Sequence, residues 1–181
     1  LYQLPAWHPG FASSGIRQAL PRCAGECVAT QRGSGMFRHT LTTQITIAAP
    51  AARIWQILMD FAAYPEWNPF IRSAQGTPQP GERLTVHIQA SGTKGMTFRP
   101  KVLAATPEQE LRWLGHLGIP ELFDGEHLFT LHPISATACA FQQAEAFRGL
   151  LVPLFRDALD RDTKRGFEEM NQALKARAEA A

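Results

Sequence analysis

The chain from about residue 41 onward consists of short segments in which apolar and polar residues alternate, and this pattern most constrains its fold. The first segment begins at Leu41, and every second residue up to Ile47 is apolar or threonine, as expected for a strand with one buried face. A series of such strands with no long helix between them predicts an antiparallel sheet. The six further strands that we expect cover about 70–75, 83–90, 96–105, 109–117, 123–132 and 138–148.

Two short helices are expected between the first two strands. Pro50 suits the first turn of a helix, and apolar residues recur over 54–59 with helical spacing. Asp60 is placed to cap a second helix over about 61–64, which we expect Pro65 to end.

The last part of the chain predicts one long helix that begins near Pro153. At 1.5 Å per residue its roughly 24 residues span about 36 Å, which is enough to cross a whole sheet. Such a helix would cover the buried face of the strands. We therefore predict an α+β domain in which a seven-stranded antiparallel sheet wraps around a long C-terminal helix, with two short helices and an internal cavity.

Composition limits the partners and the location. The 181 residues carry a formal net charge of +2 and the basic residues form no run, so we expect no nucleic-acid partner. No segment approaches the roughly 18 to 20 apolar residues that span a bilayer, and we therefore expect no stable membrane insertion. The start of the chain lacks the pattern of a secretory signal, which favours a cytoplasmic location.

Residues 1–35 differ from the rest of the chain. They contain scattered proline, glycine and serine, and no apolar period holds for long. We interpret them as a flexible N-terminal extension or a start-site artefact, with the folded domain at 36–181. Cys23 and Cys27 have no second pair of metal ligands nearby, so we expect neither a metal site nor a redox site there.

The alternation also assigns side chains to faces of the sheet. Trp113 shares a face with Gly115, and we take the face that carries the aromatic residues as the concave one. Trp67 lies in a stiff proline-bracketed corner, where it either lines the cavity mouth or plugs the core. The residues that we expect to bind a ligand are Trp67, Trp113, Phe123, His127, Phe129, Phe141, Gln143, Glu145, Phe147, Phe167 and Met170.

Three polar residues fall on this concave face. A hairpin turn centred on Ser135 would place His127 opposite Gln143 and diagonal to Glu145. In a mostly apolar pocket such groups orient a ligand, or they form a buried network that satisfies only its own members. The other histidines of the sheet fall on its outer face, so we expect no metal site and no cofactor. Cys139 is expected to be a small buried hydrophobe.

Several of these segments together resemble the START-like (SRPBCC) superfamily, and more narrowly its polyketide cyclase/dehydrase and lipid-transport group. The segments that carry the resemblance are IAAPAARIW at 47–55, DF at 60–61, YPEWNPF at 64–70, LRW at 111–113, GEHLF at 125–129 and EAFRGLL at 145–151. The resemblance runs from about His39 to Leu174. It implies the helix-grip fold, in which the sheet holds a long C-terminal helix over a deep cavity. Its members include lipid and sterol carriers, ubiquinone-binding proteins and aromatic cyclases.

Three functions follow, and the first is the one we favour. In it, the protein binds or transports a hydrophobic small molecule such as a lipid, an isoprenoid or an aromatic compound. The alternative is a polyketide cyclase/dehydrase-like enzyme in which His127 and Glu145 act as general acid and base, since histidine exchanges protons near neutral pH. A third possibility is a protein-interaction role without a fixed ligand. The fold is compatible with each of these functions.

Overall fold

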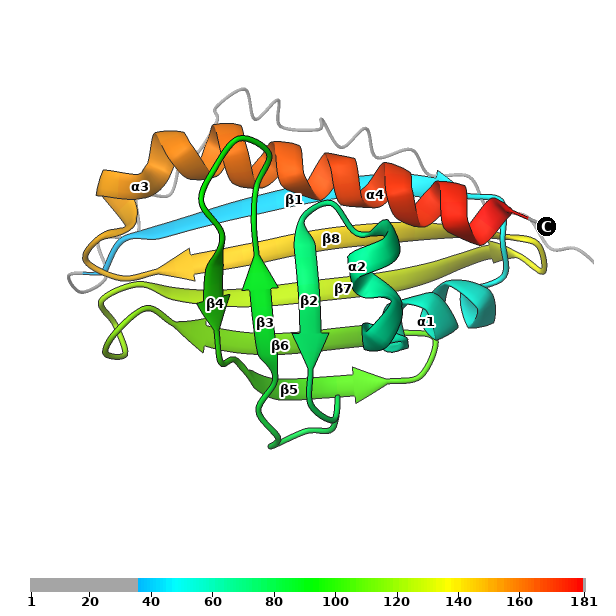
Figure 1. Ribbon diagram of the computed structural model, residues 1–181, viewed down its shortest axis with the longest axis horizontal. Coiled ribbons are helices and arrows are strands. Elements are labelled where there is room, and N and C mark those ends of the chain that lie inside the picture. Colours follow the sequence, from blue (N-terminus) through cyan, green and yellow to red (C-terminus); the bar gives the residue numbers. More distant parts are fainter. Residues whose placement is uncertain (1–35, 181) are drawn as a thin grey trace, which may run out of the picture. The chain divides into compact units, whose positions relative to one another are not determined.

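The computed structural model describes residues 36–180. In chain order the elements are β1 (Arg38–Ile47), α1 (Ala51–Met59), η1 (Phe61–Ala63), α2 (Tyr64–Trp67), β2 (Ile71–Gln75), β3 (Thr85–Ile88), β4 (Met96–Phe98), β5 (Lys101–Thr106), β6 (Glu110–His116), β7 (Asp124–Ser135), β8 (Ala138–Arg148), α3 (Val152–Ala158), η2 (Leu159–Thr163) and α4 (Lys164–Glu179). The predicted α+β helix-grip fold is confirmed: antiparallel strands hold a long C-terminal helix (Figure 1).

The strands form two sheets, which corrects the single seven-stranded sheet that we predicted. One sheet has five strands in the order β1-β8-β7-β6-β5, and the other has three in the order β2-β3-β4. The strand expected over 96–105 is two strands, because Pro100 has no N–H to continue a ladder and the chain turns from one sheet into the other there. The sheets stay joined at this corner, where Leu84 N donates to Pro100 O and Val102 N donates to Glu82 O.

The long helix runs along β1 and β8 (Figure 1). It is one continuous helical segment from Val152 to Glu179, in which the π-helical turn η2 separates α3 from α4. The buried residues of α4 are mainly apolar and recur with helical spacing, as predicted. They are Gly166, Phe167, Met170, Asn171, Leu174 and Ala178.

The short helices lie largely where they were expected. In α1 the residues Ile54, Ile57 and Leu58 are buried. The second helical segment is longer than predicted, because Pro65 lies in the first turn of α2, where a missing N–H costs nothing, and the helix continues to Trp67. Asp60 precedes η1 but makes no side-chain capping hydrogen bond, so its expected capping role was wrong.

A chain of buried polar groups fixes α4 on the sheet. Gln143 Nε2 on β8 donates to Asn171 Oδ1 and to the Phe167 carbonyl of α4, both at 3.3 Å. Asn171 Nδ2 in turn donates to Thr43 Oγ1 on β1 at 3.0 Å. Because buried polar groups are costly when unpaired, sliding the helix along the sheet would break several favourable contacts at once.

Close packing between α4 and the start of β2 fixes the helix from its other side. The Phe70 ring lies edge-on to Phe167 with ring centroids 5.4 Å apart. A Cβ atom at Gly166 would lie 2.1 Å from Phe70 Cδ2, and Phe70 is only 2 % exposed. Glycine is therefore needed at 166 for the ring to reach the helix backbone.

This packing predicts the sign of a stability change. In a helix, Gly→Ala stabilises by about 1 kcal/mol when space is free, but overpacking costs about 1–3 kcal/mol. We expect Gly166→Ala to lower the free energy of unfolding, measured by urea denaturation, because the core ring has little room to move. Ala176→Gly, at an exposed position of α4, is the control for helix propensity alone, and it should lower the free energy of unfolding by about 1 kcal/mol. A gain in stability for Gly166→Ala would contradict the close contact.

Candidate functional site

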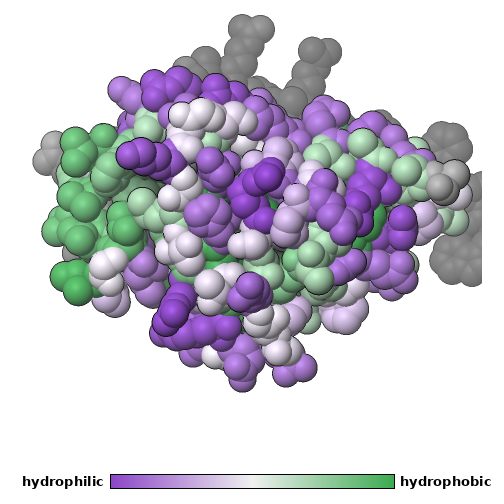
Figure 2. Space-filling view, in the orientation of Figure 1, coloured by the Kyte–Doolittle hydropathy of each residue, from purple (hydrophilic) through white to green (hydrophobic). Residues whose placement is uncertain are grey.

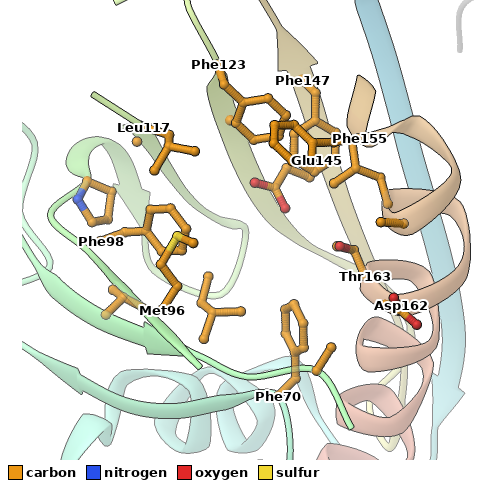
Figure 3. Close-up of a pocket in the computed structure, with 18 of the residues that line it drawn as sticks. Phe70, Met96, Phe98, Leu117, Phe123, Glu145, Phe147, Phe155, Asp162 and Thr163 are labelled. Atoms are coloured by element: carbon orange, nitrogen blue, oxygen red, sulfur yellow. The ribbon is translucent and has the colours of Figure 1, made fainter. Parts of the chain in front are cut away.

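A cavity of about 320 Å³ lies between the two sheets and the first half of the long helix. Apolar side chains of β3 and β4 form one wall, β6, β7 and β8 form another, and α3 with η2 closes the third side. Figure 3 shows Phe123, Phe147 and Phe155 on one side of the space and Met96 and Phe98 on the other. The lining is mainly apolar, as expected of a site for a hydrophobic ligand.

Two facing glycines create space on the sheet side. Gly115 on β6 pairs with Gly125 on β7, and both line the cavity. A Cβ atom at Gly115 would meet only Pro100 Cβ at 3.7 Å, so the cavity is open above this position. Further along the same face the interior is filled by large buried rings, which include Phe129 and Phe141. The cavity therefore occupies the part of the concave face where side chains are missing.

The π-helical turn shapes the helix side of the cavity. Leu159, Asp162 and Thr163 of η2 all line the space, next to Ala158 at the end of α3. A π turn inserts an extra residue into an α-helix and is frequently found at functional sites. Three side chains from this one turn line the cavity, and they include the carboxylate of Asp162 and the hydroxyl of Thr163, which Figure 3 labels.

The cavity mouth has exposed apolar residues. Met96 and Phe155 line the cavity and are 47 % and 36 % exposed. The loop before β4 is joined to α4, because Ser91 Oγ donates to Glu169 Oε2 and Arg165 Nη2 donates to the Ser91 carbonyl, each at 2.6 Å. Figure 2 shows apolar surface at the end of the domain where α3 begins. Exposed large apolar residues of the domain include Ile119, Leu150 and Leu154.

Glu145 is the carboxylate that the sheet presents to the cavity. It pairs directly with His127 across β7 and β8, and His127 Nδ1 lies 3.3 Å from Glu145 Oε2. The predicted register, with His127 opposite Gln143, was wrong by two residues. The hairpin turns at residues 136–137 with an irregularity between Pro133 and Ser135, so the pairing is displaced while the faces are preserved. Gln143 lies opposite Phe129 instead.

His127 lies behind the cavity wall. Its ring stacks on Trp113 with centroids 5.1 Å apart and an interplanar angle of 11°, and the Phe167 ring meets it edge-on at 5.1 Å. The residue is only 1 % exposed, and its Nε2 has no hydrogen-bond partner among residues 36–180. A neutral imidazole with its proton on Nδ1 can donate to Glu145, which leaves Nε2 as the unpaired acceptor.

The structure separates the predicted ligand-binding residues into two groups. Trp113, Phe123, Glu145 and Phe147 line the cavity. The other predicted residues lie in or against the packed core; they are His127, Phe129, Phe141, Gln143, Phe167 and Met170, which are buried, and Trp67, which packs on Tyr64 at 5.3 Å.

Sequence reasoning missed the lining from β3, β4 and η2, and its placement of His116 on the outer face was wrong, because His116 lines the cavity. Val86 and Ile88 alternate along β3, which is a signal for one buried face, but the pattern does not say that this face looks onto a cavity. The apolar residues Met96 and Phe98 of β4 also line it. No pattern in the helix marked the π turn.

Other chemistry is limited among the described residues. Cys139 is fully buried opposite Pro133, and burial raises the pKa of its thiol. In the part of the chain that the structure describes, no three His, Cys, Asp or Glu side chains gather as metal ligands, and no helix has the length and hydrophobicity to cross a bilayer. Cys23 and Cys27 lie outside the described residues.

Comparison with known proteins identifies the family. Residues 38–179 match the family described as "Polyketide cyclase / dehydrase and lipid transport". The chain belongs to this family. The comparison with curated proteins found no match.

Solved structures share the fold at low sequence identity. A START superfamily protein from Mycobacterium smegmatis is 22% identical with a TM-score of 0.62, and the match covers 78% of this chain and 97% of that one. The Zhui aromatase/cyclase from Streptomyces sp. R1128 is 15% identical with a TM-score of 0.62, covering 79% and 94%. Norcoclaurine synthase from Thalictrum flavum is 14% identical with a TM-score of 0.62, covering 81% and 97%. These likenesses establish a common helix-grip architecture.

The burial of Cys139 predicts slow thiol chemistry. In a Cys23→Ser/Cys27→Ser variant Cys139 is the only thiol, and we expect Ellman's reagent at pH 8 to leave it unmodified in the folded protein. The buried thiol is not accessible to the reagent, and its raised pKa lowers the fraction present as the reactive thiolate. One equivalent should react on adding guanidinium chloride. Rapid reaction without denaturant would instead indicate an accessible thiol.

Proposed function

We propose that this protein binds a small hydrophobic molecule in the cavity between its two sheets and its C-terminal helix. The observation that carries the proposal is the open space above Gly115, walled mainly by apolar and aromatic side chains. A ligand that fills this space would contact the apolar lining and remove its surface from water, which is favourable.

The volume limits the ligand. About 320 Å³ is at the small end of ligand pockets, which span roughly 300–1,000 Å³. It favours a compact aromatic or isoprenoid-sized molecule over a whole long-chain lipid. Burial of apolar ligand surface contributes roughly 25 cal/mol per Å² before the cost of association. The ligand contacts that we propose include Trp113, Phe123 and Phe147 from the sheet and Phe155 from the helix.

Filling the cavity from the sheet provides the test. In Gly115→Leu the new side chain would project into the space, where only Pro100 is near. We expect binding of N-phenyl-1-naphthylamine, a neutral lipophile whose fluorescence rises in apolar surroundings, to weaken at least tenfold. The control is Leu114→Phe, the next position on the opposite face of β6, which should bind within about twofold of the unaltered protein. Equal binding by the unaltered protein and both variants would show that the probe does not bind in this cavity.

A second candidate is an enzyme of the cyclase type, and the position of Glu145 favours it. The carboxylate lies at the cavity wall, and His127 holds its Oε2. In such an enzyme Glu145 would be the base that removes a proton from carbon next to a carbonyl of the substrate, while the buried His127 would be a positioning residue. The family description, which includes both cyclases and lipid transport, is compatible with both candidates.

The enzyme candidate makes its own prediction. With a linear poly-β-carbonyl analogue as substrate, Glu145→Gln should abolish formation of the aromatic product, followed by absorbance, because the amide cannot accept the proton. N-phenyl-1-naphthylamine should still bind, since the amide has nearly the same shape as the carboxyl group. If the unaltered protein forms no aromatic product, or if Glu145→Gln forms it at the same rate, the catalytic role of Glu145 is wrong.

A further inference from the structure

The ionisable groups that line the cavity are mostly acidic. They are Glu145 on β8, Asp162 on η2 and His116 at the end of β6, and no lysine or arginine is among the lining residues within 36–180. A cavity of this kind disfavours an anionic ligand, because no cation is there to compensate a buried negative charge.

Two of these three groups already have partners. Asp162 accepts hydrogen bonds from Arg161 at 3.0 and 3.1 Å and pairs with Arg165 at 3.5 Å. The hydrogen bond from Arg161 holds the pKa of the Asp162 carboxyl below its usual range. His116 Nδ1 lies 2.6 Å from Asp124 Oδ1. Neither group needs a ligand to complete its interactions.

Glu145 differs from them because one of its oxygens is free. Its side chain is 14 % exposed, and among residues 36–180 its only hydrogen-bond partner is His127, which contacts Oε2. Oε1 lies over Gly125, where an added Cβ atom would be only 2.5 Å away. The missing side chain at Gly125 therefore provides the room in which this oxygen sits. Figure 3 shows the carboxylate pointing into the cavity.

A purely apolar ligand would bury this carboxylate oxygen without a hydrogen-bond partner. By filling the cavity it would remove water from Oε1 and return no hydrogen bond, and a desolvated charge without a partner is costly. A ligand with a cationic donor would compensate the charge, and the interaction is stronger in surroundings of low dielectric constant. Trp113 and Phe167 hold His127 on both sides, so the imidazole is not free to turn toward Oε1.

We propose that the cavity selects a compact lipophilic amine, whose ammonium group pairs with the free Oε1 of Glu145 while its apolar body fills the space between the sheets and the helix. This proposal rests on the proposed function and gives the class of ligand. Positioning of the carboxylate is assigned to His127 and to the space at Gly125.

A series of ligands with one shape and different charge tests the proposal. The ligands are 2-naphthylmethylamine, 2-naphthylmethanol and 2-naphthoic acid, titrated calorimetrically into the full chain at neutral pH. We expect the amine to bind at least tenfold more tightly than the alcohol, and the acid to bind most weakly. In Glu145→Gln the affinity for the amine should fall at least tenfold, and the affinity for the alcohol should change by no more than about threefold.

Two further variants control the result. Glu126→Gln removes the same charge from the outer face of β7, where Glu126 pairs with Arg112 at 3.5 Å, and it should leave the preference for the amine unchanged. Gly125→Ala keeps the charges of Glu126 and Glu145, but the added Cβ atom pushes the flexible end of Glu145 away from its position. It should reduce the preference for the amine in the same direction as Glu145→Gln, which provides a second measurement if one variant folds poorly.

The outcomes separate this inference from the proposed function. If the alcohol binds and the amine binds no more tightly, or if Glu145→Gln weakens all three ligands equally, the assignment of an amine is overturned and a hydrophobic site remains. If none of the three ligands binds and Gly115→Leu does not affect binding of N-phenyl-1-naphthylamine, the cavity is not a binding site and both proposals fail.

Discussion

The Thr43 hydroxyl and the side-chain amides of Gln143 and Asn171 join the long helix to two strands of the five-stranded sheet. These groups are buried, so the helix position in which they bond to one another is favoured over positions shifted along its axis. The cavity wall formed by Leu159, Asp162 and Thr163 belongs to the same continuous helical segment. We call the hydrogen bonds of Thr43, Gln143 and Asn171 the polar link. It therefore also determines the position of that wall relative to the sheet.

The interior of the domain is divided into a filled half and a hollow half. Around the polar link the rings of Phe129, Phe141 and Phe167 fill the space between helix and sheet. Toward α3, Gly115 leaves that space open, while the room at Gly125 is taken by the Glu145 carboxylate. The packed half holds the helix in place, and the ligand proposed above would occupy the open half. Trp113 and Phe147 belong to both, because each is part of the buried core and also lines the cavity.

Alternation of residues along the strands was enough to predict much of this arrangement. It identified the face that carries Trp113, Phe123, Glu145 and Phe147, and the error of two residues in the hairpin register preserved that face because side chains alternate with a period of two. The division into two sheets at Pro100 was not predicted, although proline was visible there, because a break and a bend give the same local signal.

The boundary between core and cavity was beyond local patterns. Phe129 and Phe147 occupy equivalent positions on the concave face, yet only Phe147 lines the cavity. What separates them is their neighbours: the rings of Trp113, His127 and Phe141 pack around Phe129, whereas Phe147 lies opposite Gly125 on the neighbouring strand. The volumes of such neighbours add up across segments far apart in the chain, so they become visible only once the fold is known.

The π turn sets how α3 is rotated about the helix axis relative to α4. Each residue of an α-helix advances the side-chain direction by about 100°, so one additional residue in η2 rotates everything before it about the helix axis relative to α4. Phe155 meets Phe123 edge-on at 5.5 Å in the present setting. A relative of this protein with one residue fewer at this turn would keep the hydrogen bonds of Thr43, Gln143 and Asn171, which lie beyond the turn. It would present a different side of α3 to the sheet, so that a change of chain length alone would redraw the mouth of the cavity.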